Sequence, residues 1–255
     1  MTIRSLAFAF FTLLSCTPTA PPPPPPTASL PASRPAPVLA APPSTLNVPF
    51  AATPITCDGE PEEPMWNEAA RTGSFRDTTT GALVRPYSDT RMLADQHHLY
   101  LLLYAADEDV RVPIKPQPDQ PLGALDHFTV QIRRAADPAV LYRLEIAPNR
   151  TLYDARITGD HADAHWASHL VLGADLDGTF NNPKDEDEEW LIESALPLAS
   201  LQAKPGDELL IGIERCDTPK DGVHSCGAWG LDAKGAPVGI VWLPKGPWSA
   251  DRAKP

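Results

Sequence analysis

The sequence has little of what an enzyme or a membrane-spanning protein usually shows. Its 255 residues contain no Gly-x-Ser-x-Gly elbow, His-Glu-x-x-His pair, phosphate-binding glycine loop or dinucleotide fingerprint. The apolar run from Leu6 to Leu14 is too short to cross a bilayer as a helix. We therefore expect no catalysis, although the many carboxylates leave a part in O-glycosyl hydrolysis open as an alternative.

Basic side chains are also scarce. The chain has 21 Lys and Arg against 33 Asp and Glu, a net charge of −12. Its first 45 residues hold two arginines and no acid, so the remainder carries −14. Nucleic acids and anionic lipid surfaces need clustered Lys and Arg. The charge balance therefore excludes nucleic acid as an expected partner.

Helical periodicity is absent from residue 46 onward, apart from a short helical turn over residues 62–70. Short apolar runs recur between Gly, Pro, Asn and Asp, which predicts an all-β fold. About ten strands in one core indicate a single β-sandwich of the immunoglobulin-like or jelly-roll type. The strands are expected at residues 89–94, 98–106, 126–134, 140–147, 150–157, 168–176, 189–196, 208–215, 227–231 and 238–243.

Two expectations concern how strands lie in the sandwich. Residues 99–104 are apolar on both faces, as in a central strand, whereas residues 126–132 alternate and should have one face in water. The proline-rich segment 112–121 cannot pair in a sheet and is expected to cross the surface.

Only four cysteines are present. Cys216 ends one expected strand and Cys226 precedes the next, so in an oxidising compartment these two form the natural disulfide pair. Cys57 is then left as a thiol.

The N-terminal region resembles that of bacterial lipoproteins. Arg4 and the apolar run precede Leu13-Leu-Ser-Cys16, and in lipoproteins the cysteine of such a box is diacylated after cleavage. We expect a signal peptide at 1–15, lipidated Cys16 with a proline-rich linker at 16–45, and the folded domain at 46–250. An ordinary signal cut near Ala20, or an uncleaved anchor, remains the alternative. The expected location is the cell envelope, on the outer membrane if the cell is Gram-negative.

Several motifs occur in the order typical of one family. Residues 172–201 combine a Gly-Thr-Phe-Asn acidic loop with a strand that starts at Trp190 and ends in Pro-Leu. Over residues 50–245 the chain resembles the family 9 carbohydrate-binding modules. The matching residues are Gly178, Thr179, Asn181, Trp190, Glu193, Pro197 and Leu201, with Asp95-Gln-His-His-Leu-Tyr100, Asp126-His-Phe-Thr-Val-Gln-Ile132 and Tyr142-Arg-Leu-Glu-Ile146 alongside.

The resemblance implies a glycan ligand and candidate contacts. Arg143 falls where the family has a hydrogen-bonding arginine, and Trp229 is an inexact equivalent of a stacking tryptophan near the C-terminus. Tyr142 and Asp126 complete the expected ligand-binding set. The chain departs from the pattern at Leu122-Gly-Ala-Leu125, where sugar-binding members carry another tryptophan.

Two clusters could hold metal. Asp175, Asp177, Asp185 and Asp187 crowd an acidic loop whose oxygens suit calcium, which some family 9 modules carry, although a solvated turn explains the same acids. His161, His165 and His169 would share one face of a helix and could then bind zinc, but this segment is expected to enter a strand.

The sequence therefore predicts a non-catalytic lipoprotein that presents a glycan-binding β-sandwich, in a setting of polysaccharide catabolism. An envelope protein-interaction or assembly module on the same fold is the alternative function.

Overall fold

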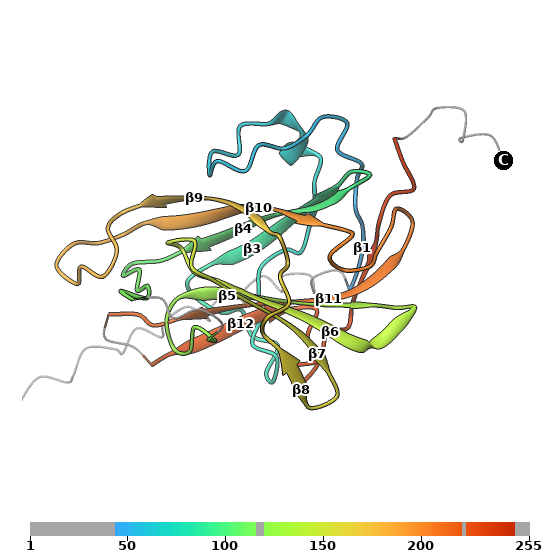
Figure 1. The fold of residues 1–255 in the computed structure, drawn as a ribbon. Coiled ribbons are helices and arrows are strands. Elements are labelled where there is room, and N and C mark those ends of the chain that lie inside the picture. The colour runs from blue at the N-terminus through green and yellow to red at the C-terminus, as the bar shows by residue number, and fades with distance from the viewer. Residues whose placement is uncertain (1–43, 116–119, 221–222, 248–255) are drawn as a thin grey trace, which may run out of the picture. The chain divides into compact units, whose positions relative to one another are not determined.

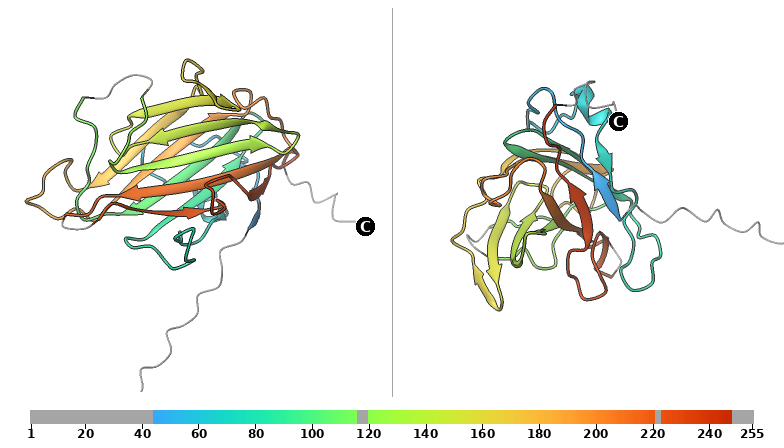
Figure 2. Two further views of the ribbon diagram at one scale, coloured as in Figure 1. Left: turned by 90° about the horizontal axis from the view of Figure 1, so that it is seen from below. Right: turned by 90° about the vertical axis from the view of Figure 1, so that its right-hand side faces the viewer.

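The computed structural model describes residues 44–115, 120–220 and 223–247, and all of them belong to one compact unit, Ala41–Pro255. Two β-sheets pack face to face as a sandwich (Figures 1 and 2). The expected all-β sandwich is confirmed. No helix among these residues is long and apolar enough to cross a membrane. The signal peptide, Cys16 and nearly all of the linker lie outside the described residues.

The larger sheet, called sheet A, has seven strands in one path and an eighth beside it. β1 pairs in parallel with β13, and all other neighbours are antiparallel. β12 pairs with β11 beside this path. In spatial order the strands are β1 (Thr45–Asn47), β13 (Gly239–Trp242), β11 (Glu208–Asp217), β5 (His127–Arg134), β6 (Asp137–Ile146), β7 (Leu152–Thr158) and β8 (His161–Asp163), with β12 at Ser225–Trp229.

The smaller sheet, called sheet B, has five antiparallel strands. Its order is β2 (Ala70–Arg71), β3 (Ser88–Ala94), β4 (His98–Ala106), β10 (Glu189–Pro197) and β9 (Val171–Asp177). β4 is buried on both faces between β3 and β10, which confirms the central strand expected at residues 99–104. A single turn of 3-10 helix, η1 (Pro64–Asn67), stands where a short helix was expected.

Strand alternation builds the main core between the sheets. Phe128, Val130 and Ile132 of β5 point inward, and the Phe128 ring meets Trp190 of β10 edge-on, with centroids 5.1 Å apart. Both rings are fully buried, so each sheet supplies one half of the same aromatic contact.

A second apolar cluster lies on the outer face of sheet B. Residues 50–70 cover this face above β4 and β10 (Figure 1), with Trp66 against Tyr100 and Leu102. Buried Glu193 of β10 holds this covering segment, residues 50–70, in place. Its two carboxylate oxygens accept hydrogen bonds from Gly59 N at 3.0 Å and from Trp66 Nε1 at 2.8 Å. The cover is therefore held by charge-assisted hydrogen bonds as well as by apolar contact.

One expectation about β5 is wrong. Its outward residues should lie in water, yet Thr129 is 1% exposed and Gln131 is 8% exposed. The backbone before β5 folds over this face, since Leu122 N donates to Glu145 Oε2 on the neighbouring strand at 2.7 Å. A period of two shows which side chains share a face but does not show what covers that face.

The expected disulfide is confirmed. Cys216 and Cys226 are direct partners across β11 and β12 and are bonded to each other, while Cys57 is a half-buried free thiol. Burial, followed by the nearby carboxylates of Glu193 and Glu63, raises the pKa of Cys57 to about 12. This thiol is therefore neutral near pH 7 and unreactive.

Candidate functional site

Polar side chains gather on the side of sheet A that faces away from the core. The inward positions on β5 and β6 are apolar, so their alternate positions point outward. The strand register places Gln131 beside Arg143, and Thr129 between Glu145 and Glu214. We call this side of the sheet the polar face; it is partly covered by the backbone before β5 and consists of His127, Thr129, Gln131, Arg143, Glu145 and Glu214. Figure 2 shows its strands side by side in the left panel.

Arg143 is the polar-face residue best placed to meet a ligand. Its Nε lies 2.8 Å and its Nη2 2.7 Å from Glu145 Oε1, and about a third of its side chain is exposed. Glu145 is itself buried and is fixed by Leu122 N through its other oxygen. The guanidinium is therefore oriented before any ligand arrives, as a rigid planar donor.

The groups around Arg143 are planar and polar. Burial lowers the pKa of His127, whose Nδ1 lies 2.6 Å from the Leu125 carbonyl oxygen. Burial also raises the pKa of Glu214, an effect opposed by Arg143 and His224. His127 and Glu145 are buried, so Arg143 and Glu214 are the two of these groups that can donate to and accept from hydroxyl groups of a ligand.

Two of the expected ligand contacts are wrong. Trp229 is 2% exposed and pairs with Ile213, while Tyr142 is 1% exposed and pairs with Ile132, so both side chains point into the core. Tyr142 also packs on Trp166, with ring centroids 5.1 Å apart. Neither ring has a face left on which a sugar could stack.

Asp126 is also unavailable as a direct contact. It is fully buried, and its oxygens accept from Thr218 N at 2.9 Å and Arg111 N at 2.5 Å. Burial is the main cause that raises the pKa of Asp126 to about 7, and the negative charge of Asp107 adds to it. Asp126 therefore joins the segment after β4 to the segment after β11, which is a structural role.

The predicted metal clusters do not form. Asp187 uses both oxygens as caps, for Thr179 N at 2.7 Å and Val110 N at 2.8 Å, and Asp185 accepts from the Thr179 hydroxyl at 2.6 Å. Asp175 and Asp177 are exposed on β9. In the described part of the chain, the groupings with metal-ligand geometry contain none of these four aspartates and none of His161, His165 and His169. Asp175 and Asp177 thus behave as the solvated acids of the alternative, whereas buried Asp187 holds the loop by accepting backbone N–H groups.

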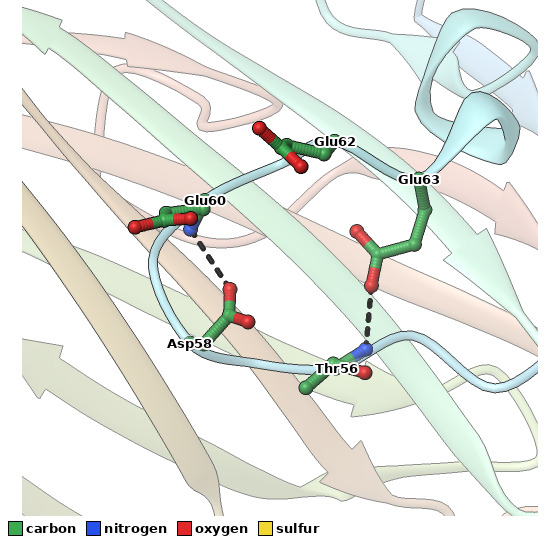
Figure 3. A pocket seen from close by; sticks show the side chains of 5 residues that line it. All are labelled: Thr56, Asp58, Glu60, Glu62 and Glu63. Atoms are coloured by element: carbon green, nitrogen blue, oxygen red, sulfur yellow. Dashed lines mark hydrogen bonds between the residues drawn. The ribbon is translucent and has the colours of Figure 1, made fainter.

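A small pocket on the covering segment is lined by four acidic residues and one threonine (Figure 3). Two of its carboxylates stabilise the local turn: Glu63 Oε1 accepts from Thr56 N at 2.8 Å and Asp58 Oδ1 from Glu60 N at 2.9 Å. Its lining is Thr56, Asp58, Glu60, Glu62 and Glu63, so it offers no aromatic ring on which a sugar could stack.

A buried charge cluster is the site feature that sequence reasoning missed. Arg215, 2% exposed, contacts Asp107 Oδ2 and Asp217 Oδ1 through its Nη2, each at 2.7 Å. Trp190 Nε1 donates to the same Asp107 oxygen at 3.0 Å. Burial raises the pKa of Asp217 to about 6, with Arg215 opposing. The cluster therefore joins the two sheets by ionic contacts at one edge of the core.

No protein-family model and no curated protein sequence matches this chain. The solved structures give clear matches. A candidate carbohydrate-binding protein from Bacteroides uniformis has a TM-score of 0.63 at 13% identity, covering 78% of this chain and 98% of its own. A family 9 carbohydrate-binding module from Caldicellulosiruptor kristjanssonii in complex with cellotriose has a TM-score of 0.56 at 15% identity, covering 83% and 98%. A family 9 module from the same organism in complex with glucose has a TM-score of 0.53 at 16% identity, and the match covers 83% of this chain and 100% of that one.

The fold is that of the family 9 carbohydrate-binding modules. The resemblance expected from the order of motifs is therefore confirmed at the level of the fold. Within the family 9 fold, Arg143 stands on the outer face of the larger sheet, on a strand flanked by β5 and β7.

The resemblance to family 9 modules raises the question of a calcium site. Asp107, Asp126 and Asp217 each place an oxygen within 4.8 Å of the others. These residues do not fit the ion. Arg215 already supplies a positive charge to two of them, and both oxygens of Asp126 accept backbone N–H groups. Calcium needs six to eight free oxygen ligands, so the guanidinium takes the place of a cation here.

The sequence did contain a signal for the partner of Arg143. Arg143 and Glu145 are two residues apart on one strand, and this spacing places them on the same face. The same rule applied to residues 127–131 selects His127, Thr129 and Gln131. Glu214 could not be found in this way, because pairing between β5 and β11 depends on the topology.

Proposed function

We propose that the chain is a non-catalytic glycan-binding domain and that its ligand binds on the polar face. The observation that carries this proposal is the exposed guanidinium of Arg143, oriented through Nε and Nη2 by a buried carboxylate. The proteins that share the fold support it, since two of those structures hold cellotriose or glucose.

The chemistry of binding follows from these groups. A guanidinium edge donates two parallel hydrogen bonds to vicinal hydroxyls, while partly buried Glu214 lies two strands away as an acceptor. Each such bond replaces one to water and nets about 0.5–1.5 kcal/mol. The predicted stacking ring is buried in the core, so we expect affinities in the high micromolar range or weaker.

Replacing Arg143 by alanine tests the site. A glycan array on residues 41–255 first identifies a ligand, and calorimetry then measures its affinity for each variant. Losing hydrogen bonds to a charged donor costs about 1.5–3 kcal/mol, so Arg143→Ala should weaken binding by about tenfold or more. Arg134→Ala is the matched control, because it removes the same charge from a pair with Asp137 beyond the polar face and should bind normally. Equal affinities for all three proteins, with folding intact, would remove Arg143 from the site.

We further propose that this domain is presented on the cell envelope through lipidated Cys16, with residues 17–45 as a proline-rich spacer. The Leu-Leu-Ser-Cys box after the apolar run is the observation behind it. Cys16→Ala should move the protein from the detergent phase to the aqueous phase when the two are separated. A variant that still partitions with detergent contradicts lipid anchoring through this residue.

A further inference from the structure

A sulfur and nitrogen cluster lies at the end of the β11–β12 pair, where Cys216 pairs with His127 at the edge of the polar face. Cys216, Cys226 and His224 bring one ligand atom each within 4.8 Å of one another. In the described chain, only this grouping and that of Asp107, Asp126 and Asp217 have metal-ligand geometry. His224 is exposed, Cys226 is half-buried and Cys216 is buried.

Neighbouring hydrogen bonds determine which ring nitrogen of a neutral His224 carries the proton. Thr218 Oγ1 lies 2.8 Å from the Ala124 carbonyl oxygen and 2.8 Å from His224 Nδ1. The carbonyl can only accept, so the single hydroxyl proton points to it, and the hydroxyl oxygen must accept a proton from Nδ1. The neutral imidazole therefore carries its lone pair on Nε2.

That lone pair faces sulfur. His224 Nε2 lies 3.7 Å from Cys226 Sγ, where a disulfide offers no proton for the nitrogen to accept. In metal sites a histidine typically donates one ring N–H to an oxygen and coordinates the ion through the other nitrogen. The contact from Nδ1 through Thr218 to Ala124 is such a supporting arrangement, already in place.

The distances suit zinc once the disulfide is reduced. With Zn–S near 2.3 Å and Zn–N near 2.1 Å, a tetrahedral site separates two sulfurs by about 3.8 Å and sulfur from nitrogen by about 3.6 Å. The distance from His224 Nε2 to Cys226 Sγ, 3.7 Å, is already close to this value. Reduction breaks the bond between the two sulfurs, which leaves them free to move apart to the separation of a tetrahedral site. Pairing from Ile213 with Trp229 to Asp217 with Ser225 holds both cysteines opposite each other meanwhile.

We propose that reduction of the Cys216–Cys226 bond creates a zinc-type metal site made of Cys216 Sγ, Cys226 Sγ and His224 Nε2. Two thiolates and one neutral imidazole balance the charge of a divalent ion. Three protein ligands leave a fourth position for water or an incoming ligand, as in open zinc sites.

The reductant is an external dithiol. One of its thiolates attacks Cys226 Sγ, the more exposed sulfur, forming a mixed disulfide and releasing Cys216 as a thiolate that takes up a proton. The second thiol of the reagent then displaces Cys226, and the reagent leaves as a cyclic disulfide. Two electrons and two protons have passed to the protein. A divalent ion that binds both thiolates displaces those two protons.

The test uses residues 41–255, which contain every described residue and exclude Cys16. The protein is reduced with dithiothreitol, desalted without oxygen and titrated with zinc against a chromophoric chelator. Cobalt in place of zinc reports thiolate ligation by its charge-transfer absorption. We expect one ion per reduced chain, none per oxidised chain, and at least tenfold weaker binding by His224→Ala. Cys57→Ala, which removes the remaining thiol, and His97→Ala, which removes another histidine, should bind like the parent.

Three results would overturn the proposal: equal binding by the oxidised protein, no binding by a reduced protein that keeps its circular dichroism, or His224→Ala binding as tightly as the parent. A chain that unfolds on reduction would also overturn it, because the site needs the β11–β12 pairing. The glycan proposal stands or fails separately, since the Arg143 experiment uses the oxidised protein.

Discussion

Arg215→Ala should lower the free energy of unfolding by about 3–5 kcal/mol, which is a large fraction of the stability of a domain of this size. Removing the guanidinium leaves the carboxylates of Asp107 and Asp217 buried and facing each other without a cation. Chemical denaturation followed by tryptophan fluorescence measures the loss, because Trp190 contacts the same cluster.

The loss should depend on pH in a definite direction. Arg215 holds down the pKa values of Asp126 and Asp217, which burial raises to about 7 and about 6. Without Arg215 both pKa values rise further. A carboxyl group whose pKa is raised by folding stabilises the protein below its unfolded pKa, and this contribution is lost as the pH rises through the folded value. Arg215→Ala should therefore be more damaging at pH 8 than at pH 5.

Arg134→Ala is the control for this experiment as well. Arg134 pairs with half-exposed Asp137 at 3.3 Å, and exposed pairs contribute at most about 1 kcal/mol. A loss for Arg215→Ala no larger than that of the control, or one independent of pH, would show that the buried cluster does not hold the sheets together.

Glu193→Ala should lower the unfolding free energy by about 3 kcal/mol. Hydrogen bonds to a charged group contribute about 1.5–3 kcal/mol each, and this substitution orphans Gly59 N and Trp66 Nε1 together. Part of that loss is offset, because burial raises the pKa of Glu193 and so makes its charged form costly. The covering segment should also become a substrate for limited proteolysis between residues 50 and 70.

Trp66→Phe separates the hydrogen bonds from the packing. It keeps the ring in its apolar cluster and removes one of the two donors to Glu193, so its loss should be about half that of Glu193→Ala. If Trp66→Phe is as damaging as Glu193→Ala, ring shape rather than the buried carboxylate fastens the cover.

The strands were predictable because their residues alternate. Each of the ten expected strands lies within three residues of an observed one, and the strand expected at 98–106 matches β4 at both ends. β1, β2 and β8 were missed, since two or three residues contain no measurable period. Their pairing depends on the neighbouring strand and not on their own sequence.

The site was harder to predict for a related reason. Trp229 and Arg143 were both selected as ligand contacts, yet they lie on opposite sides of sheet A, because the register of β12 on β11 turns Trp229 inward. A shift of one residue reverses every side chain of a strand, and single-sequence patterns do not fix that shift. The ion pair between Arg215 and Asp107 could not be predicted either, because the two residues are 108 positions apart and meet only when the two sheets pack together.

The parallel pairing of β1 with β13 determines how the domain bears mechanical load. A pull on the chain ahead of Ser44 enters through β1 and passes by hydrogen bonds through β13, β11 and β5 to β6, where Arg143 stands. Under the two proposals above, tension between lipidated Cys16 and a glycan at Arg143 would cross one sheet from strand to strand. The three residue pairs of β1 are the shortest contact on that route, so β1 would detach before the strands that carry the polar face move apart.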